Sequence, residues 1–153
     1  MLFRNKYFFL SNFSSVKINI NIGGQDLTFD SVESAYQAHK NYSLSKRFQQ
    51  LKPLEAKKYG KAIPITTPNW NIFKVYVMAT LLNIKFNDIS LFTQLKSINE
   101  EIVEDNYWKD TFWGKYKGDG KNILGRMLMF IRDNNNDLNK LYSFIETELI
   151  NDI

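Results

Sequence analysis

The strongest constraint on the fold is the helical period of residues 70–86. Apolar side chains recur there at intervals of three and four residues, which places them on one face of an α-helix. The positions on this stripe are Trp70, Phe73, Val77, Leu81 and Ile84. We predict a central core helix over residues 70–86, with Lys74 and Lys85 outside the apolar stripe.

Shorter segments surround this helix. Alternating apolar and polar residues predict strands over Val16–Ile22 and Gln25–Phe29, and the Gly23-Gly24 pair between them is typical of a hairpin turn. Short strands are also predicted over Tyr7–Leu10 and Ile102–Val103, and loops over residues 63–69 and 107–120. Further helices are predicted over residues 45–51, 53–60, 90–97, 121–132 and 138–150. These elements predict a mostly helical α+β fold with a small N-terminal antiparallel β-sheet, in a single domain over residues 1–153.

Two residue types limit the chemistry of the chain. It contains no cysteine and one histidine, His39. A disulfide framework and a thiolate metal site are therefore excluded, and a single histidine argues against a His-based metal site or a Ser-His triad. We expect no metal and no cofactor. Because no apolar run is long enough for a signal peptide or a membrane span, we expect a soluble, cytoplasmic protein without a membrane partner.

Charge is unevenly distributed along the chain. Residues 1–70 contain 10 Lys and Arg against 4 Asp and Glu, a formal charge of +6, whereas residues 71–153 contain 10 against 12, a charge of −2. A basic N-terminal half suits phosphate-bearing ligands or nucleic acid. Lys57, Lys58 and Lys61 form a local cluster with two open interpretations, a solvated helix face or a phosphate-binding group.

Residues 30–44 carry polar side chains where an apolar stripe is expected, and we predict one helix over this stretch. Glu33, Gln37 and Lys40 follow one another at intervals of four and three residues, so they share one side of that helix. Burial of a carboxylate, an amide and an ammonium is costly unless the groups find partners. The pattern therefore indicates the wall of a polar pocket.

A structural interpretation of the same helix is also open. Either Asp30 or Ser31 suits the N-cap, and with Asp30 in that position Glu33 would close a capping box. Lys40 would then be a solvated lysine whose stem covers apolar surface. We expect His39 to be a packed helix residue rather than a catalyst.

Candidate ligand-binding residues also lie outside this helix. Residues 107–120 combine aromatic side chains, aspartates and glycines without a helical or strand period, and long irregular loops in compact domains are often functional. The helix predicted after this loop points its amino end into it, and helix amino ends favour anionic groups. Asn12 is either a ligand-binding loop residue or part of an Asx-turn, and Trp70 is either a packing anchor or a stacking lid.

Short motifs, taken in their order along the chain, resemble the NADAR family, also called the YbiA-like domain. The matching segments are FLSNFSS at Phe9–Ser15, SVESAYQAHK at Ser31–Lys40, EAKKYGK at Glu55–Lys61, NW at Asn69–Trp70, KF at Lys85–Phe86, IVEDN at Ile102–Asn106, DTFWG at Asp110–Gly114 and GDGKNILGRMLMFIR at Gly118–Arg132. They cover residues 9–132, and the ordered set is more specific than any single segment.

The resemblance implies a mostly helical fold with a small β-sheet and an N-glycosidase, which cleaves the bond between a ribose C1 and an exocyclic amine. The implied substrates are ribosylated nucleobases with phosphate groups: phosphoribosylamino-pyrimidine intermediates of riboflavin synthesis, or ADP-ribose attached to guanine bases in DNA. The implied catalytic residues are Glu33, Lys40 and Asp110. The implied substrate-binding residues are Phe9, Asn12, Gln37, Gly60, Lys61, Trp70, Trp113 and Asn122.

Each implied residue type suits such chemistry. Ribosyl transfer builds positive charge at C1. A fixed carboxylate can stabilise this charge, or it can act as general base and orient the water that attacks C1. Glu33 is the candidate, with Asp110 as the second acid of a glycosidase pair. Lys40 either attacks an opened ribose to form a Schiff base, which requires a neutral amine, or binds phosphate or ribose hydroxyls as a cation. Trp70 and Trp113 would stack on the base.

Two departures from the family pattern bear on the substrate. The segment KYKGDG at residues 115–120 is more basic than expected, and Lys61 stands where Arg, which grips phosphate bidentately, is usual. Two alternative functions are a non-catalytic ADP-ribose or nucleotide reader and a basic, aromatic-rich nucleic-acid binder. The presence of both Glu33 and Lys40 argues against the reader, and no recognisable nucleic-acid-binding motif supports the binder.

Overall fold

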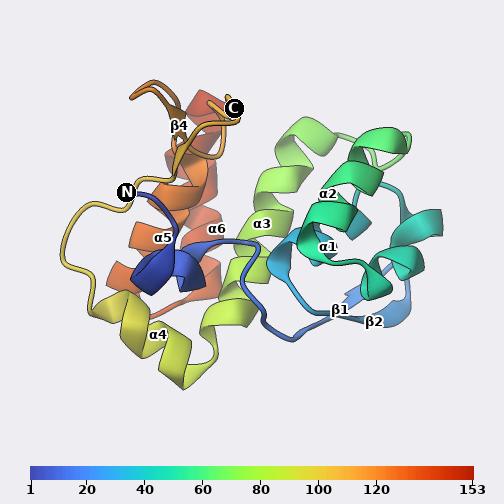
Figure 1. Ribbon diagram of the computed structural model, residues 1–153, viewed down its shortest axis with the longest axis horizontal. Coiled ribbons are helices and arrows are strands. Elements are labelled where there is room, and N and C mark those ends of the chain that lie inside the picture. Colours follow the sequence, from blue (N-terminus) through green and yellow to red (C-terminus); the bar gives the residue numbers. More distant parts are fainter. The chain divides into compact units, whose positions relative to one another are not determined.

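A computed structural model describes residues 1–153, which form two compact units (Figure 1). One unit consists of residues 12–85, and the other of residues 1–11 together with residues 86–153. The expectation of a single domain stays a prediction. None of the helices combines the length and the apolar composition that crossing a bilayer requires.

The 12–85 unit begins with the predicted hairpin. Strand β1 (Ile18–Ile22) pairs antiparallel with β2 (Gln25–Phe29), and Ile18 lies opposite Phe29 in the register. Gly23 and Gly24 form the turn with φ angles of +60° and +86°, a region that glycine enters without steric cost. The α+β class with a small N-terminal antiparallel sheet is therefore confirmed.

The hairpin leads into a helix that is shorter than predicted. Helix α1 (Val32–Ala38) begins at Ser31, whose side-chain oxygen accepts a hydrogen bond of 3.1 Å from the backbone N–H of Ser34. A 3₁₀ helix, η2 (Tyr42–Gln50), follows after a break. The prediction of one continuous helix over residues 30–44 is wrong because the chain turns at Lys40, and the predicted helix over residues 45–51 is part of η2.

Two further helices complete the 12–85 unit. Helix α2 (Pro53–Ala62) has proline at its first position, where the missing N–H is harmless, and packs beside α1 (Figure 1). Helix α3 (Trp70–Phe86) has the predicted bounds, but its buried residues occupy several faces rather than one stripe. Lys85, which we placed outside the apolar stripe, is nevertheless buried and only 1% exposed. Its Nζ atom donates to Ser14 Oγ at 3.1 Å, and burial lowers its pKa to about 7.

The other unit starts with a 3₁₀ helix, η1 (Asn5–Leu10), where a strand was predicted. Its backbone bonds are local, since the N–H groups of Tyr7 and Ser11 donate to the carbonyls three residues earlier. The remaining elements are α4 (Ile89–Lys96), β3 (Asp105–Asn106), β4 (Lys115–Tyr116), α5 (Ile123–Asp133), α6 (Leu138–Thr147) and the 3₁₀ helix η3 (Leu149–Asp152).

The predicted strand at residues 102–103 is absent. Ile102 is buried, but its carbonyl accepts from the side chain of Asn122 and not from a neighbouring strand. The short parallel pair in this region is instead β3 with β4, which joins Asp105 to Lys115. Helices α5 and α6 pack against one another in this unit (Figure 1).

Candidate active site

The carboxylate of Glu33 is buried and held by its neighbour on α1. Glu33 is 9% exposed and Gln37, one turn later, is 7% exposed. The Gln37 Nε2 atom donates a hydrogen bond of 2.9 Å to Glu33 Oε1. These two side chains share one side of the helix, as their spacing predicts, and the hydrogen bond fixes the orientation of the carboxylate.

Glu33 does not close a capping box. Because Ser31 rather than Asp30 is the N-cap, Glu33 occupies the second position of the helix and not the third. The backbone N–H of Glu33 donates to the carbonyl of Asn12 at 3.0 Å, which ties the start of α1 to the segment before the hairpin. The capping interpretation of this carboxylate is therefore wrong.

Gly60 lies on α2 directly against Gln37. A β-carbon at position 60 would overlap Gln37 Oε1 and lie 2.7 Å from Gln37 Cδ. Gly60 is buried within the helix and does not end it, since α2 continues to Ala62. The absent side chain thus lets α2 approach α1 at the point where Gln37 holds the carboxylate of Glu33.

Lys40 lies in the turn after α1. Its N–H donates to the carbonyl of Gln37, while its own carbonyl accepts from the N–H groups of Thr66 and Thr67 at 3.0 and 3.2 Å. These bonds come from a segment that is distant in sequence, and they end the helix. His39, just before it, is buried with its Nδ1 atom 2.6 Å from the carbonyl oxygen of Ala35, as expected for a packed residue.

Three charged side chains act on Lys40. Burial lowers the pKa of the half-buried Lys40, the charge of Glu33 raises it, and the charges of Lys61 and Lys74 lower it. The structure therefore brings the carboxylate and the amine into one cluster. Lys74 is a member that we did not predict, although its position one turn after Trp70 on a predicted helix was a signal that could have identified it.

Two side-chain oxygens of the predicted residues accept no hydrogen bond. Asn12 Oδ1 and Gln37 Oε1 are both buried and unpartnered. The Nδ2 atom of Asn12 contacts only Met78 Sδ, at 3.6 Å. The oxygen of an Asx-turn would accept a backbone N–H, so this interpretation of Asn12 is wrong. Buried acceptors without partners are rare in native proteins and call for an explanation.

Trp70 and a surface hollow complete this region. The indole ring of Trp70 meets the ring of Tyr36 edge to face, with centroids 5.5 Å apart. A hollow of about 400 Å³, which we did not predict, is lined by Tyr42, Thr66, Thr67, Pro68 and Phe73. Since Thr66 and Thr67 hydrogen-bond the backbone of Lys40, the wall of the hollow is fixed to that residue.

Asp110 and Trp113 belong to the other unit, in the loop that was predicted to be irregular. Asp110 Oδ1 accepts hydrogen bonds of 2.9 Å from the N–H groups of both Phe112 and Trp113. Asn106 binds the backbone of Asp110 through both atoms of its amide. One carboxylate oxygen of Asp110 thus stabilises the local loop structure. The ring of Trp113 packs edge to face on that of Phe112, with centroids 4.8 Å apart.

Asn122 is a buried structural residue. Its Oδ1 accepts from the N–H of Glu104 and its Nδ2 donates to the carbonyl of Ile102, each at 3.0 Å. Both polar atoms are therefore used within the protein, which argues against the predicted contact with substrate. The anion site expected at the amino end of α5 is also unsupported, because its first N–H groups donate to the carbonyls of Phe112 and Trp113.

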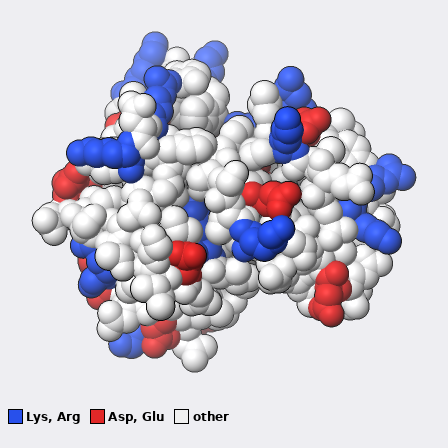
Figure 2. All heavy atoms as spheres, turned by 60° about the horizontal axis from the view of Figure 1, so that its bottom comes forward, with Lys and Arg blue, Asp and Glu red and all other residues white.

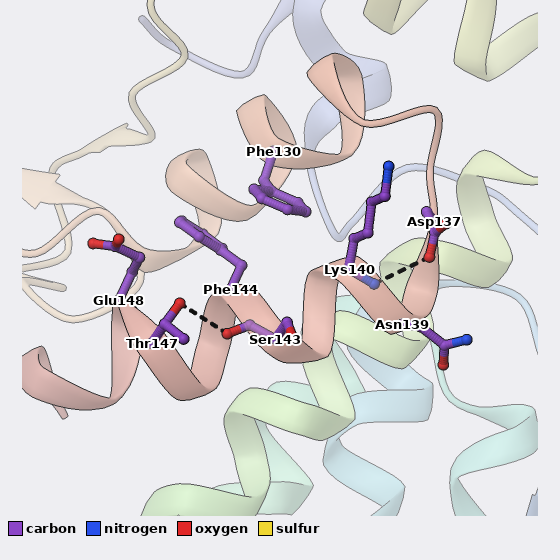
Figure 3. Close-up of a pocket in the computed structure, with 8 residues that line it drawn as sticks. All are labelled: Phe130, Asp137, Asn139, Lys140, Ser143, Phe144, Thr147 and Glu148. Atoms are coloured by element: carbon purple, nitrogen blue, oxygen red, sulfur yellow. Dashed lines mark hydrogen bonds between the residues drawn. The ribbon is translucent and has the colours of Figure 1, made fainter.

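Two further hollows lie in the same unit. Phe9, a predicted binding residue, is half-buried in η1 and lines a hollow of about 280 Å³ together with Lys6 and Tyr7. The hollow of about 550 Å³ in Figure 3 contains none of the predicted residues. It is formed by α5 and α6 around the stacked rings of Phe130 and Phe144, whose centroids are 4.4 Å apart.

Comparisons with known proteins agree with the motifs. The model of the NADAR domain matches residues 2–134. The maize (Zea mays) protein "Riboflavin biosynthesis protein PYRR, chloroplastic" is 32% identical over 139 aligned residues, and the alignment covers 80% of this chain. The chain spans only 22% of the length of that maize protein.

A solved structure is similar as well. The NMR structure of the E. coli protein YbiA matches with a TM-score of 0.73 and 28% identity, covering 92% of this chain and 86% of that protein. The fold and the sequence motifs thus point to the same relatives. Since the family model spans most of its length, the chain belongs to the NADAR family.

Proposed function

We propose that the protein is an N-glycosidase that hydrolyses the bond between a ribose C1 and an exocyclic amine of a nucleobase. The observation that carries this proposal is the buried carboxylate of Glu33. Gln37 orients this carboxylate, and its charge raises the pKa of Lys40. In the reaction the C1–N bond breaks, the oxygen of water bonds to C1, and the amine leaves with one proton.

Glu33 stabilises the transition state in this scheme. Positive charge develops on C1 and the ring oxygen as the bond to the amine breaks, and a carboxylate that is already oriented needs no rearrangement at that moment. The same carboxylate is suited to take a proton from the attacking water. Its burial supports the role, because charges interact more strongly where water is scarce.

Lys40 has two roles available. The burial and the two neighbouring ammonium groups that lower its pKa favour the neutral amine, the form that attacks an opened ribose. As an ammonium it would instead bind phosphate or ribose hydroxyls. Reduction with borohydride during turnover separates the two, since only a Schiff base leaves a permanent ribosyl adduct on Lys40.

Further residues of the 12–85 unit support a phosphate-bearing nucleobase substrate. We assign the unpartnered oxygen of Asn12 as an acceptor for a ribose hydroxyl or a base N–H group, whereas that of Gln37 faces Gly60. The hollow beside Lys40 and the ring of Trp70 suit a flat base. Lys61 and Lys74 supply positive charge for phosphate.

The substrate class has two members. The name of the maize relative supports a phosphoribosylamino-pyrimidine, an intermediate of riboflavin synthesis. ADP-ribose linked to guanine in DNA has the same C1–N bond and also carries phosphates. Both substrates offer an exocyclic amine as leaving group, so the scheme around Glu33 applies to either one.

The test is turnover of both substrates in parallel, with released ribose 5-phosphate or ADP-ribose measured by chromatography. We expect the wild-type protein to hydrolyse at least one of them, which also identifies the substrate. If both survive while ADP-ribose still binds in calorimetry, the protein is a reader rather than an enzyme.

A further inference from the structure

The loop of residues 107–121, here called the aromatic–basic loop, presents aromatic rings to solvent. Tyr107 is 68% exposed and Trp108 is 46% exposed. Their rings meet edge to face with centroids 5.2 Å apart and an interplanar angle of 80°. Two large adjacent rings form an exposed apolar feature directly after β3, and such features often mark interaction sites.

Cations accompany the aromatic rings of this loop. The guanidinium of Arg4 lies 5.3 Å from the centre of the Tyr107 ring. The Nζ atoms of Lys117 and Lys121 lie 5.3 and 5.7 Å from the rings of Tyr116 and Phe112. Rings and cations therefore alternate along one short segment, within the range of cation–π contacts.

The charge of the loop differs from that of its surroundings. Residues 107–121 contain four lysines against two aspartates, although residues 71–153 as a whole carry −2. One of those aspartates, Asp110, directs an oxygen at backbone N–H groups, whereas Asp119 is exposed. Figure 2 shows several basic side chains gathered at the upper left of the face in view.

The loop is held in shape by its own hydrogen bonds. The Nδ2 atom of Asn106 donates to the carbonyls of Asp110 and Lys115, at 2.8 and 3.0 Å. The backbones of Tyr116 and Asp119 exchange two hydrogen bonds across a tight turn. A loop whose backbone is ordered before binding loses little conformational entropy on binding.

We propose that the aromatic–basic loop binds a single strand of nucleic acid, with bases stacked on Tyr107 and Trp108 and phosphates beside Arg4 and the loop lysines. Exposed rings stack on bases of any sequence because every base has a π-face, and lysines track the backbone. A duplex does not offer its base faces to such rings. This inference goes beyond the proposed glycosidase and concerns unmodified strands.

Fluorescence anisotropy with labelled oligonucleotides tests the inference. The probes are twelve-residue oligo(dT), oligo(rU) and a DNA duplex of the same length, each at several salt concentrations. We expect the single strands to bind with an affinity that falls as salt rises, and the comparison of oligo(dT) with oligo(rU) identifies the preferred strand. No binding at low salt, or tighter binding of the duplex, would overturn the proposal.

Paired variants assign the contact to the rings. Tyr107→Leu and Trp108→Leu keep apolar bulk but lose the π-face, and each is expected to weaken binding by about tenfold or more. Tyr107→Phe and Trp108→Phe keep the π-face and should keep the affinity. Ile89→Ala, at another exposed apolar position of the same unit, is the control. Leucine variants that bind as tightly as wild type contradict the inference.

A lysine variant tests the backbone contact. Lys117→Gln should make the dependence of log affinity on log salt shallower by about 0.7, the value for one phosphate contact of a single strand. Lys140→Gln, an exposed lysine on α6, should leave that slope unchanged. If Lys117→Gln and Lys140→Gln show the same salt dependence of affinity, Lys117 does not contact the nucleic-acid backbone. Because unmodified oligonucleotides are used, the outcome does not depend on glycosidase activity.

Discussion

Gly60 of α2 lies so close to Gln37 of α1 that a β-carbon at position 60 would be 2.7 Å from Gln37 Cδ. Gln37 in turn donates the hydrogen bond that orients Glu33. The sequence resemblance implies that Gly60 binds substrate, whereas its contact in the structure is with the side chain that positions the carboxylate. Gly60 is therefore a positioning residue in our account.

Gly60→Ala should lower both stability and turnover. Alanine is the better helix former by about 1 kcal/mol, but overpacking a buried contact costs about 1–3 kcal/mol, so we expect the loss to prevail. Displacement of Gln37 should also move Glu33 and lower kcat. Urea denaturation and turnover measure the two effects, with exposed Lys58→Ala on the same helix as control. A variant that is more stable than wild type and fully active would refute this role.

The charges around Lys40 predict signed changes in its pKa. Lys61→Gln removes a positive neighbour and should raise the pKa of Lys40, whereas Glu33→Gln removes a negative neighbour and should lower it. NMR titration of isotopically methylated lysines measures the shift. Lys58, which is not among the groups that act on Lys40, provides the control variant Lys58→Gln. Equal titration in all of these proteins would show that the cluster does not form.

The lowered pKa of buried Lys85 predicts that the stability of the protein depends on pH. Burial lowers its pKa from 10.5 to about 7, so between these values the unfolded chain binds more protons than the folded one. The free energy of unfolding should therefore rise with pH across this window, by at most about 1.4 kcal/mol per unit. Below the folded pKa both states are protonated and the slope vanishes.

The variant Lys85→Met isolates this contribution. Urea denaturation of wild type and variant at several pH values from 7 to 10 should give curves whose difference grows in favour of wild type as pH rises. Lys58→Met, at an exposed position, should run parallel to wild type. Parallel curves for Lys85→Met would mean that this amine stays charged in the folded protein.

Local patterns predicted the elements that depend on local interactions. The glycine pair between alternating segments predicted the hairpin, and the spacing of apolar residues predicted α3 with its correct bounds. The polar side chains of Glu33 and Gln37 also lie together as their spacing requires, because one turn of helix determines their separation.

Contacts between distant segments explain what the sequence could not predict. Helix α1 ends early because N–H groups of Thr66 and Thr67 bind the carbonyl of Lys40. The burial of Lys85 depends on a helix being covered on several faces, which a single apolar stripe does not reveal. Asn122 likewise became structural through the backbone of Ile102 and Glu104.

Asp110 offers a test of catalysis against structure. Asp110→Asn retains an oxygen that accepts from the N–H groups of Phe112 and Trp113, so we expect this variant to keep its fold and most of its turnover. Asp110→Ala loses both hydrogen bonds and should be destabilised by about 1–3 kcal/mol. Thermal unfolding and turnover together decide the matter. A folded Asp110→Asn protein with little activity would support Asp110 as the second acid.

The most direct test of the account is the single-turnover rate of C1–N cleavage by Glu33→Gln, measured on the substrate that the wild type hydrolyses. The amide keeps the shape of the side chain but loses its charge and its basicity. We predict a rate lower by about 10²- to 10⁴-fold, with unchanged affinity for ADP-ribose in calorimetry. A rate equal to that of wild type would contradict the assignment of Glu33 and with it the proposed reaction scheme.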